Sequence, residues 1–574
     1  MPEYLAPAVY VEETSFRAKS IAGVGTSTAA FVGPCARGPI SAGATPVTPP
    51  LLTSVSDFER YYGGPDPLRI GGNPTPNYLA LAVQAFFANG GARLYVGRVA
   101  GAAAAAPTSG PIGAADSGVS LTARAPAGAR IEGSTVNFRV TFAQVETDST
   151  KAIALRKPAG TMVRIADEYY VIGTSPMQTS AANTNAFDNL ADGGALRLVS
   201  LAVTVADPTG VVWEAADLGF HNRHPRYVGA AMGATPPNAE DALTNPVRLD
   251  LDPAVTAVGL RVALCQASGA GRTVGLLNGS DGSGAPSSTA YAEALTTLLA
   301  LEDISIIAAP GGAELGNGAA INQALIAAAE ARRSYRIAVL ETAANQSIAQ
   351  VRATKSAIDS SHAALYYPWV TMANPAAATD PLAPRQIDVP PAGAVCGIYA
   401  RTDIERGVWK APANETVTGA IGLQRHVRFG EQEVLNPLGI NCIRALPNRG
   451  IRVWGARTTS SDPEWKYVPV RRYFLYLEAS IDRGTQWAVF EPNGERLWDN
   501  VRQTVTDFLY NEWVSGALLG ATPAEAFFVR CGRDTMTQND IDNGRLVCLV
   551  GVAALKPAEF VIFRIGQKTA GADA

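Results

Sequence analysis

The sequence predicts a multidomain α/β protein. Its parts are a mainly parallel sheet core covered by helices, an inserted β-rich domain, and a C-terminal α+β domain with extended N- and C-terminal arms. Three patterns support this prediction: strands alternate with helices from residue 272, strand-like runs fill about 118–255, and both ends carry short strand patterns. A chain of 574 residues is also longer than one hydrophobic core usually serves.

The first expected part of the core follows a short arm. Residues 1–25 form the arm and contain the strand pattern LAPAVYVEE. Residues 26–104 begin the core, with the strand TSTAAFVG, the helix NYLALAVQAFFA before an Asn-Gly-Gly stop, and the strand ARLYVGRVA. The small, Pro- and Gly-bearing residues 101–117 have the composition of a linker, so we expect a domain boundary there.

The next part is predicted as an inserted β-rich domain over 105–255. Runs such as STVNFRVTFAQV, GTMVRIADEYYVIG and GALRLVSLAVTVAD are separated by turn residues, without convincing helices. The core then resumes over 256–400, where TVGLLNG, ISIIAAPGG, RIAVLETA and HAALYYPWVTM read as strands between helices. We expect the first strand of this sheet to come from the N-terminal piece, across the insertion.

The C-terminal α+β domain is expected over 401–555. Its clearest element is the helix ERLWDNVRQTVTDFLYNEWV, in which apolar residues recur at helical spacing from Leu497 to Trp513. After it, AFFVRC, GRLVCLVGVAAL and AEFVIFRIGQK read as three strands. Residues 556–574 form the expected C-terminal arm.

Composition excludes several classes of partner. The formal net charge of -4 gives no strong field for binding nucleic acid or anionic lipid. The start of the sequence lacks the pattern of a secretory signal, and no run is long and apolar enough to span a membrane. We therefore expect no nucleic-acid partner, no direct membrane insertion, and a protein that is made and kept in the cytoplasm.

No arrangement of reactive residues indicates an enzyme. A phosphate-binding loop with a terminal Lys and Ser or Thr is missing, as is the G-x-S-x-G turn of serine hydrolases. His221 and His224 have metal-ligand spacing but no helix or acidic partner around them. The sequence thus predicts no catalytic, cofactor-binding or metal site. An oligomeric α/β enzyme with an unfamiliar site remains an alternative.

Several of these segments resemble the contractile phage tail sheath protein family. The resemblance covers YLAPAVYVEE, STAAFVGPCARGP and NYLALAVQAFFANGGARLYVGRV near the start. It is more specific in AGAVCGIYARTDIERGVWKAPANE, LNPLGINCIRALPNRGIRVWGARTT, KYVPVRRYFLYLEASIDRGTQWAVFEPN and LWDNVRQTVTDFLYNEWVSGALLGATPAEAFFVRC. These motifs keep one order and cover about half of the chain, at its two ends and not in its middle.

The resemblance implies a structural subunit that stacks as six-fold rings around an inner tube and contracts when a baseplate triggers it, driving the tube through the host envelope. Its implied partners are itself, the inner tail tube protein, and the baseplate and tail terminator proteins. The implied location is the virion tail sheath, and insertions such as 105–255 face outward in related sheaths. The sheath subunit of a contractile bacteriocin or another injection system would have an almost identical sequence pattern and remains an alternative.

A lone terminal strand exposes backbone groups that are satisfied only at a sheet edge, which can belong to another subunit. The family's arms add strands to neighbouring subunits. The residues expected to do so are Val9, Tyr10, Val11, Phe560, Val561, Ile562, Phe563, Arg564 and Ile565. The polar helix face with Asp499, Arg502, Gln503 and Asp507 is the candidate tube-facing surface, and the alternative is a plain solvated side of the helix. Six cysteines show no C-x-x-C pair, and buried free thiols are expected. Cys35, Cys531 and Cys548 are candidates for bonds between subunits.

Overall fold

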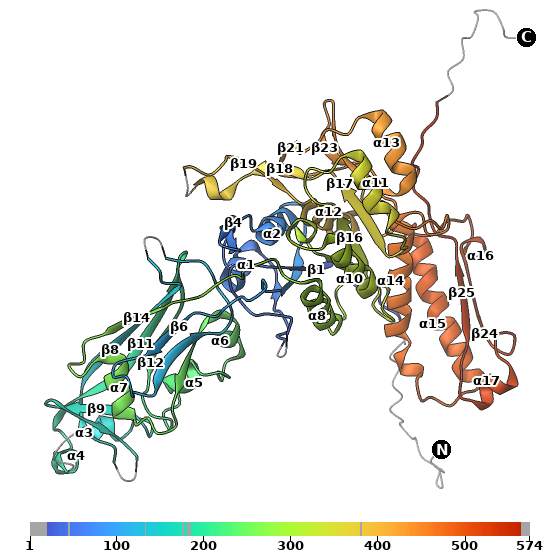
Figure 1. Cartoon of the computed structure of the whole chain (residues 1–574). Coiled ribbons are helices and arrows are strands. Elements are labelled where there is room, and N and C mark those ends of the chain that lie inside the picture. Colours follow the sequence, from blue (N-terminus) through green and yellow to red (C-terminus); the bar gives the residue numbers. More distant parts are fainter. Residues whose placement is uncertain are drawn as a thin grey trace, which may run out of the picture. The chain divides into compact units, whose positions relative to one another are not determined.

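The computed structural model describes residues 20–43, 46–131, 134–174, 177–180, 185–378 and 381–563. Contacts within the chain define two compact units (Figure 1). The larger unit contains residues 26–405 and 411–468, and the smaller contains residues up to 25, 406–410 and those from 469. Residues 411–468 therefore belong with the larger unit, whereas the sequence predicted a C-terminal domain from residue 401.

A nine-stranded mixed sheet forms the core of the larger unit. In spatial order its strands are β2 (Leu51–Leu52), β5 (Arg93–Arg98), β1 (Thr28–Gly33), β15 (Ile306–Ala308), β16 (Ile337–Glu341), β17 (Ala363–Tyr367), β22 (Ile440–Leu446), β23 (Gly450–Val453) and β20 (Glu415–Thr416). All pairs from β5 to β22 are parallel. Since β1 pairs with β15, the prediction that the first strand comes from across the insertion is confirmed.

Helices cover both faces of this sheet, as its continuously apolar strands predicted. The helices of the unit outside the insertion are α1 (Val55–Tyr62), α2 (Tyr78–Ala88), α8 (Ser288–Leu299), α9 (Gly312–Leu315), α10 (Gly318–Glu330), α11 (Ile348–Ser356), α12 (Ala392–Arg406) and α13 (Phe429–Leu435). Ala30 and Val32 of β1 share a buried cluster with α8 and α10. Phe31, which points to the opposite face, meets Phe86 of α2 edge-on at 5.5 Å between ring centroids.

Glycines allow α2 and α12 to approach closely. A Cβ on Gly393 would lie 2.3 Å from the carbonyl oxygen of Ala82, and one on Gly397 would lie 2.4 Å from that of Phe86. No side chain fits at such distances from a backbone atom. The two glycines of the AGAVCG segment are therefore required by helix packing in this core.

The insertion is a β-sandwich with a helix against it. One sheet has the order β10-β9-β11-β8-β14 with β12 beside β11, and the other has the order β13-β7-β6. Its elements are β6 (Thr108–Pro111), β7 (Val119–Ala123), β8 (Phe138–Thr150), β9 (Met162–Ile165), β10 (Glu168–Val171), β11 (Ala195–Asp207), β12 (Gly210–Leu218), β13 (Val247–Leu251), β14 (Arg272–Leu276), α3 (Lys151–Ala154), α4 (Ala186–Asn189), α5 (Val228–Ala231), α6 (Ala239–Thr244) and α7 (Ala257–Cys265). Side chains of both sheets and of α7 form one buried cluster.

Two expectations about the limits of the insertion are wrong. The strand at 272–276 was expected in the core sheet, but β14 pairs antiparallel with β8, so the insertion extends beyond residue 255. Residues 101–117 are not a plain linker, because they contain β6 and make bridges from Ala102 to Gly284 and from Ala105 to Ser280. The chain thus enters and leaves the insertion along two adjacent antiparallel segments.

Smaller elements complete the larger unit. They are two minor sheets, of β18 (Val370–Ala373), β19 (Gln386–Val389) and β21 (Ala420–Leu423), and of β3 (Leu68–Ile70) and β4 (Asn73–Thr75), with the 3-10 turns Pro375–Ala378 and Asn436–Leu438.

The smaller unit consists of two long helices and a two-stranded sheet (Figure 1). Its elements are α14 (Val468–Gly484), whose first residue lies at the unit's limit, the 3-10 turn Gln486–Ala488, α15 (Glu495–Val514), α16 (Pro523–Ala526), β24 (Phe527–Cys531), α17 (Gln538–Asp542) and β25 (Cys548–Val552). Leu497, Val501, Val505 and Phe508 of α15 are buried in its core. The helix predicted from their spacing is confirmed.

Candidate assembly surfaces

In the part of the chain that the structure describes, the sheet of β24 and β25 has two open edges. The strands pair antiparallel with Val529 opposite Val550, and neither strand pairs with a third in the described part of the chain. The Ala553 N–H donates to the Ala526 carbonyl at 2.8 Å, which makes these two residues a hydrogen-bonded pair. Because such pairs alternate along an antiparallel ladder, Val529 and Val550 form a non-hydrogen-bonded pair, and their N–H groups point to the outer edges.

The two faces of this sheet differ in exposure. Val529 and Val550 are half-buried against the core around α15. On the other face, Phe528 is 46% exposed and Leu549 is 51% exposed, and the Arg530 guanidinium lies 5.3 Å from the Phe528 ring centroid. A strand added at either edge would therefore continue a sheet that is already supported by a core and carries apolar side chains outside.

The described starts of both arms lie in this smaller unit. Ile21 is 9% exposed within its core, and the Val24 N–H donates to Ser480 Oγ at 3.1 Å. A Cβ on Gly23 would lie 2.1 Å from the Tyr476 hydroxyl, so the chain passes close against α14. The N-terminal arm therefore starts from the unit that also contains the open sheet.

The predicted arm strands are only partly covered by the structure. Val9, Tyr10, Val11, Arg564 and Ile565 lie outside the described residues, so their strand exchange stays a prediction. Residues Phe560, Val561, Ile562 and Phe563 are 70–83% exposed and have no regular secondary structure. The third strand predicted over AEFVIF is therefore not formed within the described chain.

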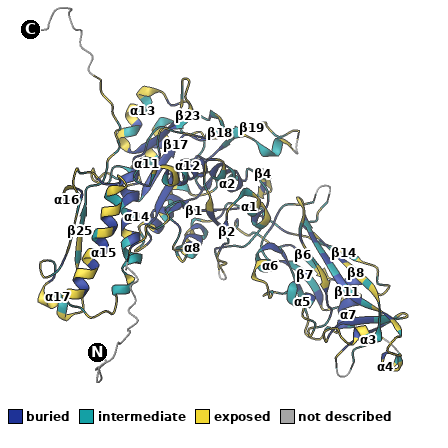
Figure 2. Cartoon of the chain, turned by 180° about the vertical axis from the view of Figure 1, so that it is seen from behind, coloured by how far each residue is buried: buried dark blue, intermediate teal, exposed yellow. Residues whose placement is uncertain are grey.

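The polar face of α15 is exposed, as the sequence predicted (Figure 2). Its side chains contact one another: Arg502 Nη2 lies 2.6 Å from Asp499 Oδ1 in an ion pair, and the Gln503 amide Nε2 donates a hydrogen bond to Asp507 Oδ1 at 2.6 Å. This gives the face a fixed pattern of exposed, nearly balanced charge. Whether it contacts a tube is untested and stays a prediction.

The buried face of α15 is joined to α14 by two tyrosines. Tyr476 donates to Glu512 Oε1 at 2.8 Å and Tyr473 donates to Glu512 Oε2 at 3.2 Å. Burial raises the pKa of Glu512, although the two hydroxyl donors act in the opposite direction. These two hydrogen bonds hold α14 and α15, the helices that support the open sheet, in a fixed position relative to each other.

None of the six cysteines, all of which lie among the described residues, forms a disulfide in the structure. Cys35 and Cys531 are each 2% exposed, and only Cys548 of the three candidates is half-buried. Burial raises the pKa of Cys35 to about 12 and so disfavours its thiolate. The expectation of bonds between subunits is thus not supported for Cys35 and Cys531, because their sulfurs are enclosed within this chain.

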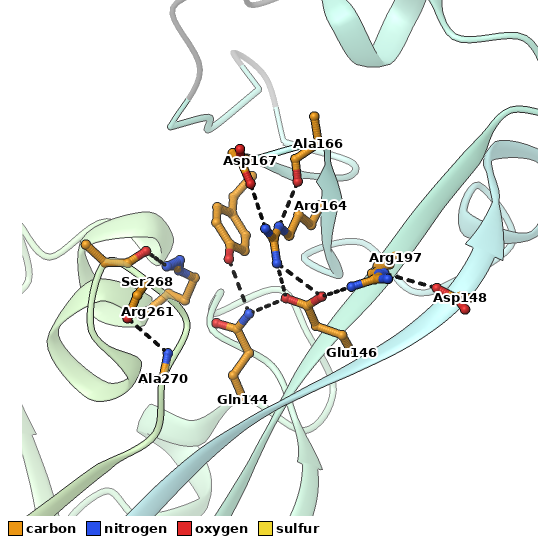
Figure 3. A network of polar contacts seen from close by, with 12 residues as sticks. Gln144, Glu146, Asp148, Arg164, Ala166, Asp167, Arg197, Arg261, Ser268 and Ala270 are labelled. Atoms are coloured by element: carbon orange, nitrogen blue, oxygen red, sulfur yellow. Dashed lines mark hydrogen bonds and ion pairs between the residues drawn. The ribbon is translucent and has the colours of Figure 1, made fainter.

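The insertion contains a dense polar network around Glu146 (Figure 3). Its carboxylate accepts from Arg164 Nη1 at 3.0 Å, from Arg197 Nη1 at 3.2 Å and from Gln144 Nε2 at 2.6 Å. Burial acts to raise the pKa of Glu146, but these donors outweigh it and the pKa lies below its ordinary value.

This network was not predicted from the sequence. Gln144, Glu146 and Asp148 are spaced two residues apart and therefore share one face of β8, which could have indicated it. Its partners come from β9 and β11, so only the strand register brings them together. The centre of the cluster consists of the Glu146 carboxylate, the guanidinium groups of Arg164 and Arg197, and the Gln144 amide (Figure 3). These ion pairs and hydrogen bonds connect the neighbouring strands β8, β9 and β11.

The candidate histidines have local roles. His221 Nδ1 accepts from the Arg223 N–H and His224 Nδ1 accepts from the Arg226 N–H, as in turns. Among the described residues, no group of three or more His, Cys, Asp or Glu side chains is placed to hold a metal ion. No described helix combines the length and apolar character needed to cross a bilayer.

Comparison with known proteins identifies two matching families. Residues 281–459 match the phage tail sheath protein central domain, and residues 460–568 match the phage tail sheath C-terminal domain. A prophage major tail sheath protein of Pseudomonas aeruginosa is 28% identical over 31% of this chain and 45% of its own length. The tail sheath protein of Burkholderia phage BcepMu is 28% identical over 22% of this chain and 28% of its own length. The chain thus matches less than half the length of these curated relatives.

Solved structures match nearly the whole chain. The contracted helical sheath of the anti-feeding prophage has a TM-score of 0.55 and 22% identity, over 99% of this chain and 100% of that chain. The contracted sheath complex of the extracellular contractile injection system PVC has a TM-score of 0.53 and 21% identity, over 99% of both chains. The matched proteins are structural sheath proteins and not enzymes. Given both family matches and this shared fold, the chain belongs to the phage tail sheath protein family.

Proposed function

We propose that this protein is the subunit of a contractile tail sheath. The subunits polymerise as stacked six-fold rings around an inner tube, and the array contracts to drive the tube through a host envelope. The N- and C-terminal arms link neighbours by adding strands to the sheet of β24 and β25. The observation that carries this proposal is that sheet, whose two edges are open among the described residues and which lies on a supported core.

The energetics favour arms with apolar side chains. Each backbone hydrogen bond contributes about 0.5–1.5 kcal/mol, whereas ordering a backbone residue costs about 1–2 kcal/mol. Backbone pairing alone is therefore marginal. Burying a residue such as Val9 or Ile562 contributes about 1.5–3 kcal/mol. The exposed apolar residues Phe560–Phe563 are suited to provide this stabilisation by becoming buried in a neighbouring subunit.

The proposed partners are other copies of this chain, the inner tail tube protein, and the baseplate and tail terminator proteins. The proposed location is a tail sheath assembled in a bacterial cytoplasm and carried in the virion. During contraction, the arms would keep neighbours joined while the folded units rotate and slide.

Deletion of residues 1–13 tests the arm directly. The variant should give a soluble, folded monomer that does not polymerise, because only the arm strand is removed. Circular dichroism and sedimentation check the fold and the mass, and electron microscopy checks polymerisation. Ordered sheath from this variant would refute strand exchange by the N-terminal arm.

Proline substitutions test the acceptor edges. In Val529→Pro and Val550→Pro, an outward N–H is lost while the ladder between β24 and β25 keeps its hydrogen bonds, as proline permits on edge strands. At least one variant should fail to polymerise, while Val529→Ala and Val550→Ala, which keep the N–H, should polymerise. Sheath formation by both proline variants would contradict strand addition at this sheet.

A second candidate is the sheath of an injection particle other than a phage. The sheaths of the anti-feeding prophage and of an extracellular contractile injection system are among the solved structures that match nearly the whole chain, which keeps this candidate beside the phage sheath. Sheath tail proteins of Listeria innocua and Desulfitobacterium hafniense match 94% and 96% of the chain with similar TM-scores, so the shared fold is compatible with both candidates. The neighbouring genes separate the two: capsid and terminase genes are expected only beside a phage sheath.

A further inference from the structure

Two cysteines face each other at one end of the open sheet. Cys531 is the last residue of β24 and Cys548 is the first of β25, and the two are paired in the ladder. The loop from 532 to 547, which includes α17, begins and ends at this pair. A covalent bond here would close that loop at its base.

The type of pair suits a disulfide. Counting along the ladder from the hydrogen-bonded pair of Ala526 and Ala553, Cys531 and Cys548 form a non-hydrogen-bonded pair. Cα atoms in such pairs are about 4.5 Å apart, with side chains closer than in the alternate pairs. Disulfides usually join Cα atoms about 4.4–6.8 Å apart. The separation typical of such a pair therefore lies within the range that a disulfide requires.

The two thiols have unequal access. Cys531 is 2% exposed and lies in the core beneath the sheet, whereas Cys548 is half-buried at the margin of that core. Hydrogen bonding between the two sulfurs raises the pKa of Cys531, to which burial adds, and it lowers the pKa of Cys548. A small oxidant in solvent would therefore meet Cys548 first.

We propose that Cys531 and Cys548 form an oxidation site, which reacts with a low-molecular-weight disulfide such as glutathione disulfide to give an intrachain disulfide. The Cys548 thiolate attacks one sulfur of glutathione disulfide, and one glutathione leaves. The Cys531 sulfur then loses its proton, attacks the Cys548 sulfur of the mixed disulfide, and releases the second glutathione. Two electrons pass from the cysteines to the oxidant, and the two thiol protons end on the two glutathione molecules.

This site is independent of the proposed sheath function. The disulfide would fasten the loop end of β24 and β25 and limit opening of the loop at 532–547. Its side chains lie on the core face of the sheet, whereas a new strand would join along the edges. Oxidation is therefore compatible with strand addition.

The test uses the full chain with glutathione disulfide, followed by mass spectrometry of peptides prepared without reductant. The expected result is a monomer that loses two hydrogen atoms and yields a cross-linked peptide containing Cys531 and Cys548. The oxidised chain should resist proteolysis in the 532–547 loop, and its C-terminal unit should unfold at a temperature higher by on the order of a few °C.

Two serine variants serve as matched controls. Cys531→Ser should stop at a stable glutathione adduct on Cys548, and Cys548→Ser should remain unmodified at the buried Cys531. Circular dichroism checks that both variants are folded. The proposal is overturned if the wild-type chain keeps a glutathione adduct at Cys548, forms a disulfide-linked dimer, or shows no cross-linked peptide.

Discussion

The carboxyl group of Glu341 accepts a hydrogen bond from the Gly311 N–H, where β16 ends and α9 begins. Glu341 is 3% exposed, and burial raises its pKa to about 8, although the backbone N–H groups of Gly311 and Ala392 act to lower it. The carboxyl group is therefore protonated in the folded protein at neutral pH, and its proton is part of the core.

This proton should make the larger unit sensitive to rising pH. The folded-state pKa lies above the ordinary value of 4.5, so the stabilisation is complete below that value and is lost as pH rises through about 8. The unfolding free energy should fall by at most about 1.4 kcal/mol per pH unit in this window. Thermal unfolding of wild type and Glu341→Gln, measured from about pH 5 to 8, should show a flatter slope for the variant. Parallel slopes would contradict the assignment.

Glu146 should have the opposite pH dependence. Its folded-state pKa is lowered, so its contribution is present above the ordinary carboxyl pKa and is lost as pH falls through the folded value. Glu146→Gln should destabilise the insertion by about 1–2 kcal/mol at neutral pH, with a smaller difference in acid. Hydrogen exchange of β8, β9 and β11 provides the measurement. Asp167→Asn is the control, because the Asp167 side chain is 94% exposed and its pair with Arg164 should contribute little.

Helix packing predicts a large effect at Gly393. In Gly393→Val, the new side chain would collide with the backbone of Ala82, and α2 would have to move away from α12. We expect a loss of about 3 kcal/mol or more, or insoluble protein, measured by urea unfolding or by yield. Gly430→Ala in α13 is the matched control, since its nearest new contact is the end of the Glu433 side chain at 3.9 Å. Equal stability of the two variants would contradict the close approach.

Charge reversal on α15 separates a tube contact from a local ion pair. Asp499→Arg and Arg502→Asp each break an exposed pair, so stability should change by less than about 1 kcal/mol. If this face contacts the tube, both single variants should assemble poorly on purified tube, as measured by co-sedimentation and electron microscopy.

The double variant Asp499→Arg with Arg502→Asp restores the pair with its polarity reversed. It should still assemble poorly if binding to the tube depends on which of the two positions carries the negative charge. Recovery of assembly in the double variant would instead assign these residues to helix stability, and normal assembly of all three would remove this face as the contact.

Much of the core could be predicted because its periodic patterns are long. The spacing of apolar residues from Leu497 to Trp513 predicted α15, and the Asn-Gly stop predicted the end of α2 at Ala88. The parallel sheet followed from strands that are apolar on both faces. In each case a local pattern is sufficient to predict the element, because the positions of its apolar residues indicate which of its faces are buried.

Partners in space could not be predicted in the same way. The strand at 272–276 was recognised, but five residues do not encode whether they pair with β8 or with the core sheet. The short helices of the insertion, such as α3 with four residues, are too brief to show periodicity. Glu146 meets Arg164 and Arg197 only because of strand register, and the pairing of Cys531 with Cys548 likewise needs the ladder.

The bridges between Ala102 and Gly284 and between Ala105 and Ser280 bring the two ends of the insertion together. A segment whose ends lie side by side can be replaced as a unit without stretching the polypeptide on either side. Evolution could therefore swap this module among tails that meet different environments. An engineer could graft a foreign cargo domain at the same junction.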